Sequence, residues 1–63
     1  MKKIGVIEFR YNKSEDIMHF RLIEGTAHPS AAQMTAARNL MRARGIGKTR
    51  FEIFNDDRTI KEL

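Results

Sequence analysis

The sequence contains no cysteine and no tryptophan, and it has one proline and four glycines among 63 residues. Without cysteine the chain has neither a disulfide framework nor a thiolate zinc site. Since there are only two histidines, we expect no structural metal and no cofactor. No apolar run approaches the roughly 20 residues needed to cross a bilayer, and Ile4–Phe9 is too short for the core of a signal peptide. We therefore expect no membrane span and a cytoplasmic location.

The short length limits the core that the chain can build. We expect one domain over residues 1–63, and a domain of this size buries only about 60% of its unfolded surface. A second copy that shares the burial would stabilise it, so we expect a homodimer. The formal net charge of +4 favours acidic partners, which include acidic proteins and nucleic acid.

Ser30–Arg44 predicts one amphipathic helix. Ser30 and Gln33 fit a capping box, in which each side chain bonds the backbone N–H of the other residue. Gly45 follows as the C-terminal cap. Helical spacing places these residues on the face toward the core: Met34, Ala37, Leu40 and Met41. Arg38 and Arg42 point the other way.

Three segments alternate between apolar and polar residues, as strands do: Lys3–Tyr11, Ile17–Glu24 and Thr49–Phe54. Asn12–Asp16 between the first two predicts a hairpin loop, and Gly25–Pro29 breaks the second strand before the helix. Arg58–Leu63 fits a short strand or a helical turn, and we favour the strand. The fold class is therefore α+β in the order β-β-α-β, with the helix on one face of a three- or four-stranded antiparallel sheet.

The alternation also assigns residues to the two faces of the sheet. Under the helix we expect Ile7, Phe9, Met18, Phe20, Leu22, Phe51 and Ile53. The open face should carry Glu8, Arg10, His19, Arg21, Arg50 and Glu52, with Val6, Ile17, Ile23 and Phe54 as apolar members. We expect Glu8 and Glu52 to form cross-strand ion pairs with the arginines. The apolar members indicate contact with another chain, mainly at the sheet edge.

Two groups of residues are candidates for binding. Five cations lie within a stretch that has no acid, and they could contact nucleic acid or an acidic partner: Arg38, Arg42, Arg44, Lys48 and Arg50. The alternative is an ordinary solvated helix face. The second group is Arg10, His19, Arg21 and Phe54 on the open face. Because only Phe54 and Tyr11 are available there for base stacking, paired charge is the favoured interpretation.

The glycine-flanked turn Gly45–Thr49, with the sequence GIGKT, ends like a phosphate-binding P-loop. However, Arg42 stands where the first glycine of that loop is required, and a strand follows instead of a helix. The turn is also similar to that of helix-hairpin-helix modules, which again need a second helix. We interpret it as a helix cap and a turn into a strand.

No set of residues makes a convincing catalytic or metal site. Ser30 beside His28 is explained as a helix cap, and Asp56–Asp57 would need further oxygen ligands to hold a cation. We therefore expect no enzyme and no small-molecule substrate. The leading hypothesis is a small regulatory, adaptor or inhibitor protein that acts by protein–protein contacts through a sheet edge or the open face. The alternative is a small basic nucleic-acid-binding protein that uses the Arg38–Arg50 helix and turn.

Overall fold

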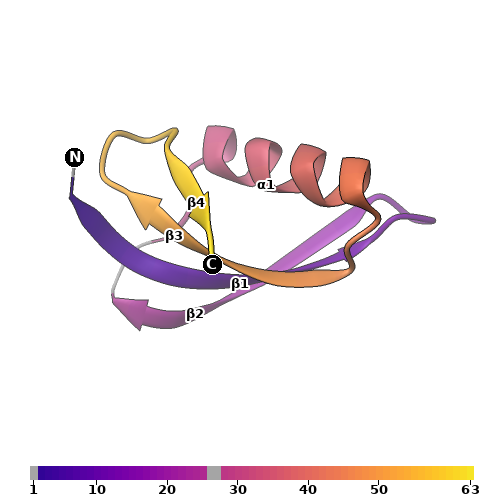
Figure 1. Ribbon diagram of the computed structural model, residues 1–63, viewed down its shortest axis with the longest axis horizontal. Helices are drawn as coiled ribbons and strands as arrows, with labels where there is room; N and C mark the ends of the chain where they lie inside the picture. The colour runs from indigo at the N-terminus through magenta and orange to yellow at the C-terminus, as the bar shows by residue number, and fades with distance from the viewer. Residues whose placement is uncertain (1, 26–27) are drawn as a thin grey trace.

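A computed structural model describes residues 2–25 and 28–63, and within them it shows one helix on a four-stranded antiparallel sheet (Figure 1). The strand order is β2-β1-β3-β4. The elements are β1 (Lys3–Asn12), β2 (Ile17–Gly25), α1 (Ala31–Arg44), β3 (Lys48–Phe54) and β4 (Ile60–Glu62). This confirms the α+β class and the β-β-α-β order, and it resolves the last segment as a strand paired with β3. The predicted break at Gly25–Pro29 includes Thr26 and Ala27, which lie outside the described residues.

The N-terminus of α1 is held by the predicted capping box. The backbone N–H of Gln33 donates to Ser30 Oγ at 3.0 Å, and the N–H of Ser30 donates to Gln33 Oε1 at 2.9 Å. Gln33 is also only 1% exposed. Its buried Nε2 donates to the carbonyl oxygens of Phe54 at 2.8 Å and Thr59 at 3.2 Å. One side chain therefore both caps the helix and joins it to the turn between β3 and β4.

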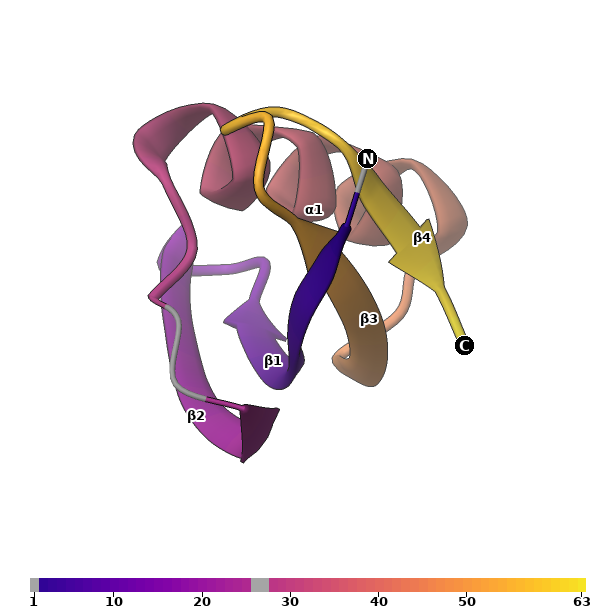
Figure 2. The same cartoon turned by 90° about the vertical axis from the view of Figure 1, so that its left-hand side faces the viewer.

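The core lies between α1 and the two central strands, as the end-on view in Figure 2 shows. β1 pairs with β3 so that Ile7 lies opposite Phe51 and Phe9 opposite Thr49. The rings of Phe9 and Phe51 meet edge to face, with centroids 5.6 Å apart, an arrangement that aromatic pairs prefer. Among the described residues, the buried cluster comprises Ile7, Phe9, Tyr11, Ala37, Met41, Phe51 and Ile53.

The prediction that Phe20 and Leu22 are buried beneath the helix is wrong. They share the helix-side face with Phe9 and Ile7, their partners on β1, but they are 37% and 41% exposed. The reason is that α1 packs over β1, β3 and β4, whereas β2 is the outer strand on the opposite edge (Figure 2). Leu40 is likewise half-buried at the margin of the core, while Met41 is completely buried.

Candidate interaction surface

The five cations of the basic run do not form one surface. Arg38, Arg42 and Arg44 belong to α1, whereas Lys48 and Arg50 belong to β3. Lys48 lies opposite Arg10, and Arg50 lies opposite Glu8. Since paired residues point to the same side of a sheet, Lys48 and Arg50 lie on the open face with Glu8 and Arg10, away from the helix. The turn at Gly45 therefore divides the run between two sides of the molecule.

Arg42 is joined to the hairpin loop between β1 and β2. Its Nη2 lies 2.6 Å from Asp16 Oδ1, and its Nε donates to Tyr11 Oη at 3.0 Å. Tyr11 in turn donates to Asp16 Oδ1 at 2.7 Å. The hydrogen bond from Tyr11, reinforced by that from Arg42, lowers the pKa of Asp16. The same two partners raise the pKa of Arg42.

The other two arginines of the helix also contact the protein. Arg44 forms an ion pair with Glu62 of β4. Arg38 is half-buried beside Met18 and Met34, and its Nε is a buried nitrogen without a hydrogen-bond partner among the described residues. These side chains therefore connect α1 to the sheet and the loop as well as facing solvent.

On the open face, Glu8 is buried beneath two arginines. It is 3% exposed, and its two carboxylate oxygens face Arg21 Nε at 2.9 Å and Arg50 Nε at 3.4 Å. The hydrogen bond from Arg21 is the main cause that lowers the pKa of Glu8, and Arg50 adds to it. The predicted ion pairs of this carboxylate with arginines are thus present.

Glu52 has a different partner from the one predicted. Its Oε2 lies 3.6 Å from Lys3 Nζ, which also lies 3.5 Å from Glu24 Oε1. Glu24 and Glu52 are the two residues opposite Val6, so the lysine bridges β2 and β3, the two neighbours of β1. Val6 is only 6% exposed, although within the described residues the one helix, α1, lies on the other side of the sheet.

The remaining basic residues of the open face gather at the hairpin end of the sheet. Arg10 lies opposite His19 on one side and Lys48 on the other, and all three are exposed. None of them forms an ion pair within the described residues. Phe54 is half-buried at the far end of β3, so the structure does not bring it together with the arginines as a stacking platform.

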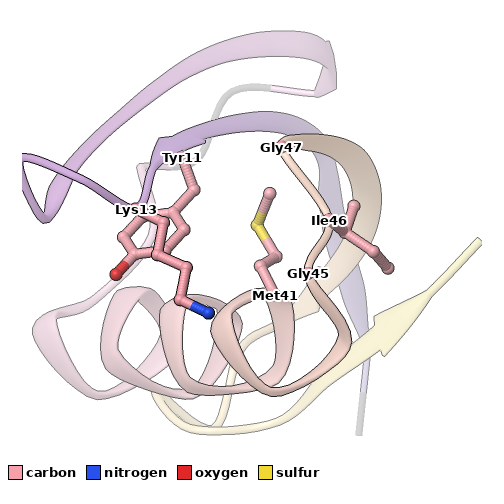
Figure 3. Close-up of a pocket in the computed structure, with 6 residues that line it drawn as sticks. All are labelled: Tyr11, Lys13, Met41, Gly45, Ile46 and Gly47. Atoms are coloured by element: carbon pink, nitrogen blue, oxygen red, sulfur yellow. The ribbon is translucent and has the colours of Figure 1, made fainter.

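The glycine-flanked turn has no free amides at its start for a phosphate. The N–H of Gly45 donates to the carbonyl of Arg42, and the N–H of Ile46 donates to that of Met41 at 2.9 Å, which is the Schellman pattern of helix ends. Gly45 has the left-handed φ of 67° that this cap requires. Figure 3 shows the small hollow beside the turn, where the side chains of Tyr11, Lys13 and Met41 converge. The turn is therefore a helix cap, as interpreted from the sequence.

The other sequence candidates have structural roles. Asp56 Oδ1 accepts from the N–H groups of Arg58 at 3.2 Å and Thr59 at 2.8 Å, and the bonds from Thr59 lower the pKa of Asp56. The ring of His28 lies edge to face with that of Phe20. Across residues 2–25 and 28–63, no three His, Asp or Glu side chains gather as a metal site would require.

The edge strand β2 carries exposed apolar side chains, some of which the sequence analysis expected in the core. Among the described residues, five large apolar side chains are exposed, and four of them lie on this nine-residue strand. They are Ile17, Phe20, Leu22 and Ile23. The fifth is Leu63 at the end of the chain. The sequence contained a signal for this exposure, because apolar residues occupy both alternating sets of positions in the strand.

No protein-family model, curated protein or solved structure matches this chain. In the part of the chain that the structure describes, no helix has the length and apolar character needed to span a membrane.

Proposed function

We propose that this chain is a small non-enzymatic protein that acts through protein–protein contacts at the outer edge of β2, as a regulator, adaptor or inhibitor. The observation that carries the proposal is the concentration of exposed apolar side chains on this one edge strand. The proposal includes a cytoplasmic location, as expected from the sequence.

An open edge strand suits such a role for two physical reasons. Its outer N–H and C=O groups are available to pair with a strand of another chain. Its exposed apolar side chains gain free energy when a partner removes them from water. The opposite edge of the sheet is β4, which has three residues and offers far less of either contribution.

Affinity capture from a lysate of the source organism, with nuclease present, tests the proposal. We expect the wild type to retain a protein partner, and a Phe20→Lys, Leu22→Lys double variant to lose it. Leu63→Lys is the matched control, because it also places a lysine at an exposed apolar position but away from β2. Equal far-UV circular dichroism of the three proteins would show that the fold is retained. A partner that both variants retain equally would contradict the proposal.

One observation favours nucleic-acid binding as a second candidate. Arg10 and Lys48 lie side by side on the open face, and neither forms an ion pair within the described residues. We expect such binding to weaken steeply as salt rises. Arg10→Glu with Lys48→Glu should abolish a mobility shift, whereas Arg44→Glu, on the helix side, should reduce it little. A shift that survives the first pair of substitutions would contradict this candidate.

A further inference from the structure

The residues of β2 follow a pattern that is the same in both directions. Phe20 stands at the centre, flanked by the basic or polar pair His19 and Arg21 and then by the apolar pair Met18 and Leu22. Ile17 precedes this segment, and Ile23 follows it as the extra residue where the register with β1 shifts. When two identical strands pair antiparallel about a two-fold axis, each residue before the centre meets its counterpart after the centre. In a strand with this symmetry, apolar residues meet apolar residues of the second copy.

We propose that the occupant of the β2 edge is a second copy of this chain, whose β2 pairs antiparallel with the first in a register centred on Phe20. The inference rests on the proposed function, because it names the partner of the same edge. The pairing joins the two four-stranded sheets edge to edge. Because the two-fold axis is perpendicular to the sheet, both helices lie on the same side.

On the helix side, this register covers the side chains that the monomer leaves exposed. Phe20 meets Phe20 of the second copy, and Leu22 meets Met18. Phe20 lies against Phe9, with ring centroids 6.3 Å apart, and against His28 at 6.0 Å, yet it remains 37% exposed. Aromatic and aliphatic cross-strand pairs stabilise a sheet, so the second copy completes the packing around this ring.

On the open side, the same register brings His19 opposite Arg21 of the second copy. Arg21 Nε lies 2.9 Å from the buried carboxylate of Glu8, which also faces Arg50 Nε at 3.4 Å. The carboxylate of Glu8 therefore offsets part of the positive charge that Arg21 brings next to the imidazole of His19.

Other registers lose this complementarity. A register centred on Arg21 would place two arginines directly opposite each other, which is unfavourable. One centred on His19 would place Arg21 opposite Ile17 and Leu22 opposite Asp16. A shift of the register by one residue would place the helix-side face of one copy and the open face of the other on the same side of the joined sheet.

Sedimentation equilibrium of the purified full-length protein over a wide concentration range tests the association. We expect a reversible dimer whose dissociation constant rises by about tenfold or more in Phe20→Lys, since that substitution places two cations at the two-fold axis. Leu63→Lys should leave the constant unchanged. A wild type that remains monomeric throughout would overturn the inference.

Single cysteines test the register without background, because the chain has no cysteine of its own. Directly opposite Cα atoms in an antiparallel pair are about 4.5–5.5 Å apart, which is within reach of a disulfide. We expect Met18→Cys and Leu22→Cys to form few crosslinks alone and to crosslink efficiently when mixed under mild oxidation. Alone, the two copies of either residue would lie about 13 Å apart along the strand.

The outcomes separate this inference from the proposed function. A dimer that persists in Phe20→Lys and fails to crosslink in the mixture would use another surface, and the inference would fall. A monomeric protein that captures a different partner through Phe20 and Leu22 would overturn the inference and support the proposed function. A monomer that captures nothing through β2 would contradict both.

Discussion

Arg42 of α1 and Asp16 of the β1–β2 loop are joined by an ion pair of 2.6 Å, although they are 26 positions apart in the chain. Tyr11 binds both partners and lies beneath the guanidinium, whose central carbon is 5.9 Å from the ring centroid. The arrangement fixes the hairpin loop against the last turns of the helix. It also engages one of the arginines that the sequence analysis considered for contact with nucleic acid or an acidic partner.

Removal of Arg42 should raise the pKa of Asp16. In Arg42→Met the carboxylate loses a charge-assisted hydrogen bond and a nearby cation, and both favour its ionised form. The bond from Tyr11 remains, so we expect the pKa to rise toward its usual value without reaching it. An NMR titration of the Asp16 carboxyl measures the change, with Arg58→Met as the control. An unchanged titration would mean that the ion pair does not persist in solution.

Acid should destabilise the protein partly through Glu8. Because Arg21 lowers its folded-state pKa, this carboxylate stabilises the fold above its ordinary pKa, and the contribution is lost as pH falls through the lowered value. Urea unfolding at a series of pH values below 5 should therefore show a smaller pH dependence for Glu8→Gln than for the wild type. Glu15→Gln, in the exposed loop, should follow the wild type. Parallel curves for all three proteins would contradict the ion-paired role of Glu8.

The stability of the fold should be sensitive both to truncation of Gln33 and to a substitution that keeps its size. Gln33→Ala leaves the carbonyls of Phe54 and Thr59 without this donor, and we expect a loss of about 1–3 kcal/mol in the free energy of unfolding. Gln33→Glu should fail to restore stability, because a carboxylate cannot donate to two carbonyls. Urea unfolding measures both, with Asn39→Ala on the exposed side of α1 as the control. Full stability in Gln33→Glu would rule out the double donation.

Met41 and Leu40 should differ although they are neighbours in the helix. Met41 is completely buried and Leu40 is half-buried. We expect Met41→Ala to cost roughly 2–5 kcal/mol through the cavity that it leaves, and Leu40→Ala to cost less. Chemical unfolding of the two variants gives the comparison. If Leu40→Ala proved the more damaging, the helix would be rotated relative to the sheet from the arrangement in Figure 2.

Two glycines with left-handed backbone should respond unequally to alanine. A Cβ on Gly45 would meet nothing within 4 Å, so Gly45→Ala should cost only the conformational strain, roughly 1–2 kcal/mol. A Cβ on Gly25 would overlap the carbonyl oxygen of Ile4, in addition to the same kind of strain. Gly25→Ala should therefore lower the thermal midpoint more than Gly45→Ala does. Equal midpoints would show that the backbone near Gly25 moves without cost.

The sequence predicted local structure well, because the signals for it are local. Alternation identified the strands, and the spacing of Ser30, Gln33 and Gly45 identified both helix ends. It could not predict how much of the sheet one helix would cover, since that depends on where the chain crosses from β2 to α1. For this reason Phe20 was assigned to the correct face and still expected to be buried.

The candidate binding residues show the same limit. Five cations close together in the sequence were treated as one group, but the turn after Gly45 sends Lys48 and Arg50 to the far side of the sheet. Ion pairs such as Arg44 with Glu62 join elements whose relative placement no periodicity reveals. The burial of Glu8 depends on side chains from three strands, so the alternating pattern predicted its ion pairs with arginines but not its burial.

The two edge strands of the sheet differ greatly in length: β2 has nine residues and β4 has three. β4 also carries Lys61, and its Glu62 is held by Arg44, features that discourage a further strand from adding there. A fibril grows by strand pairing only if each molecule can pair with a neighbouring molecule at both edges of its sheet. If two copies pair through β2 as proposed, the longer edge strand of each is used, and we expect a closed dimer that does not polymerise.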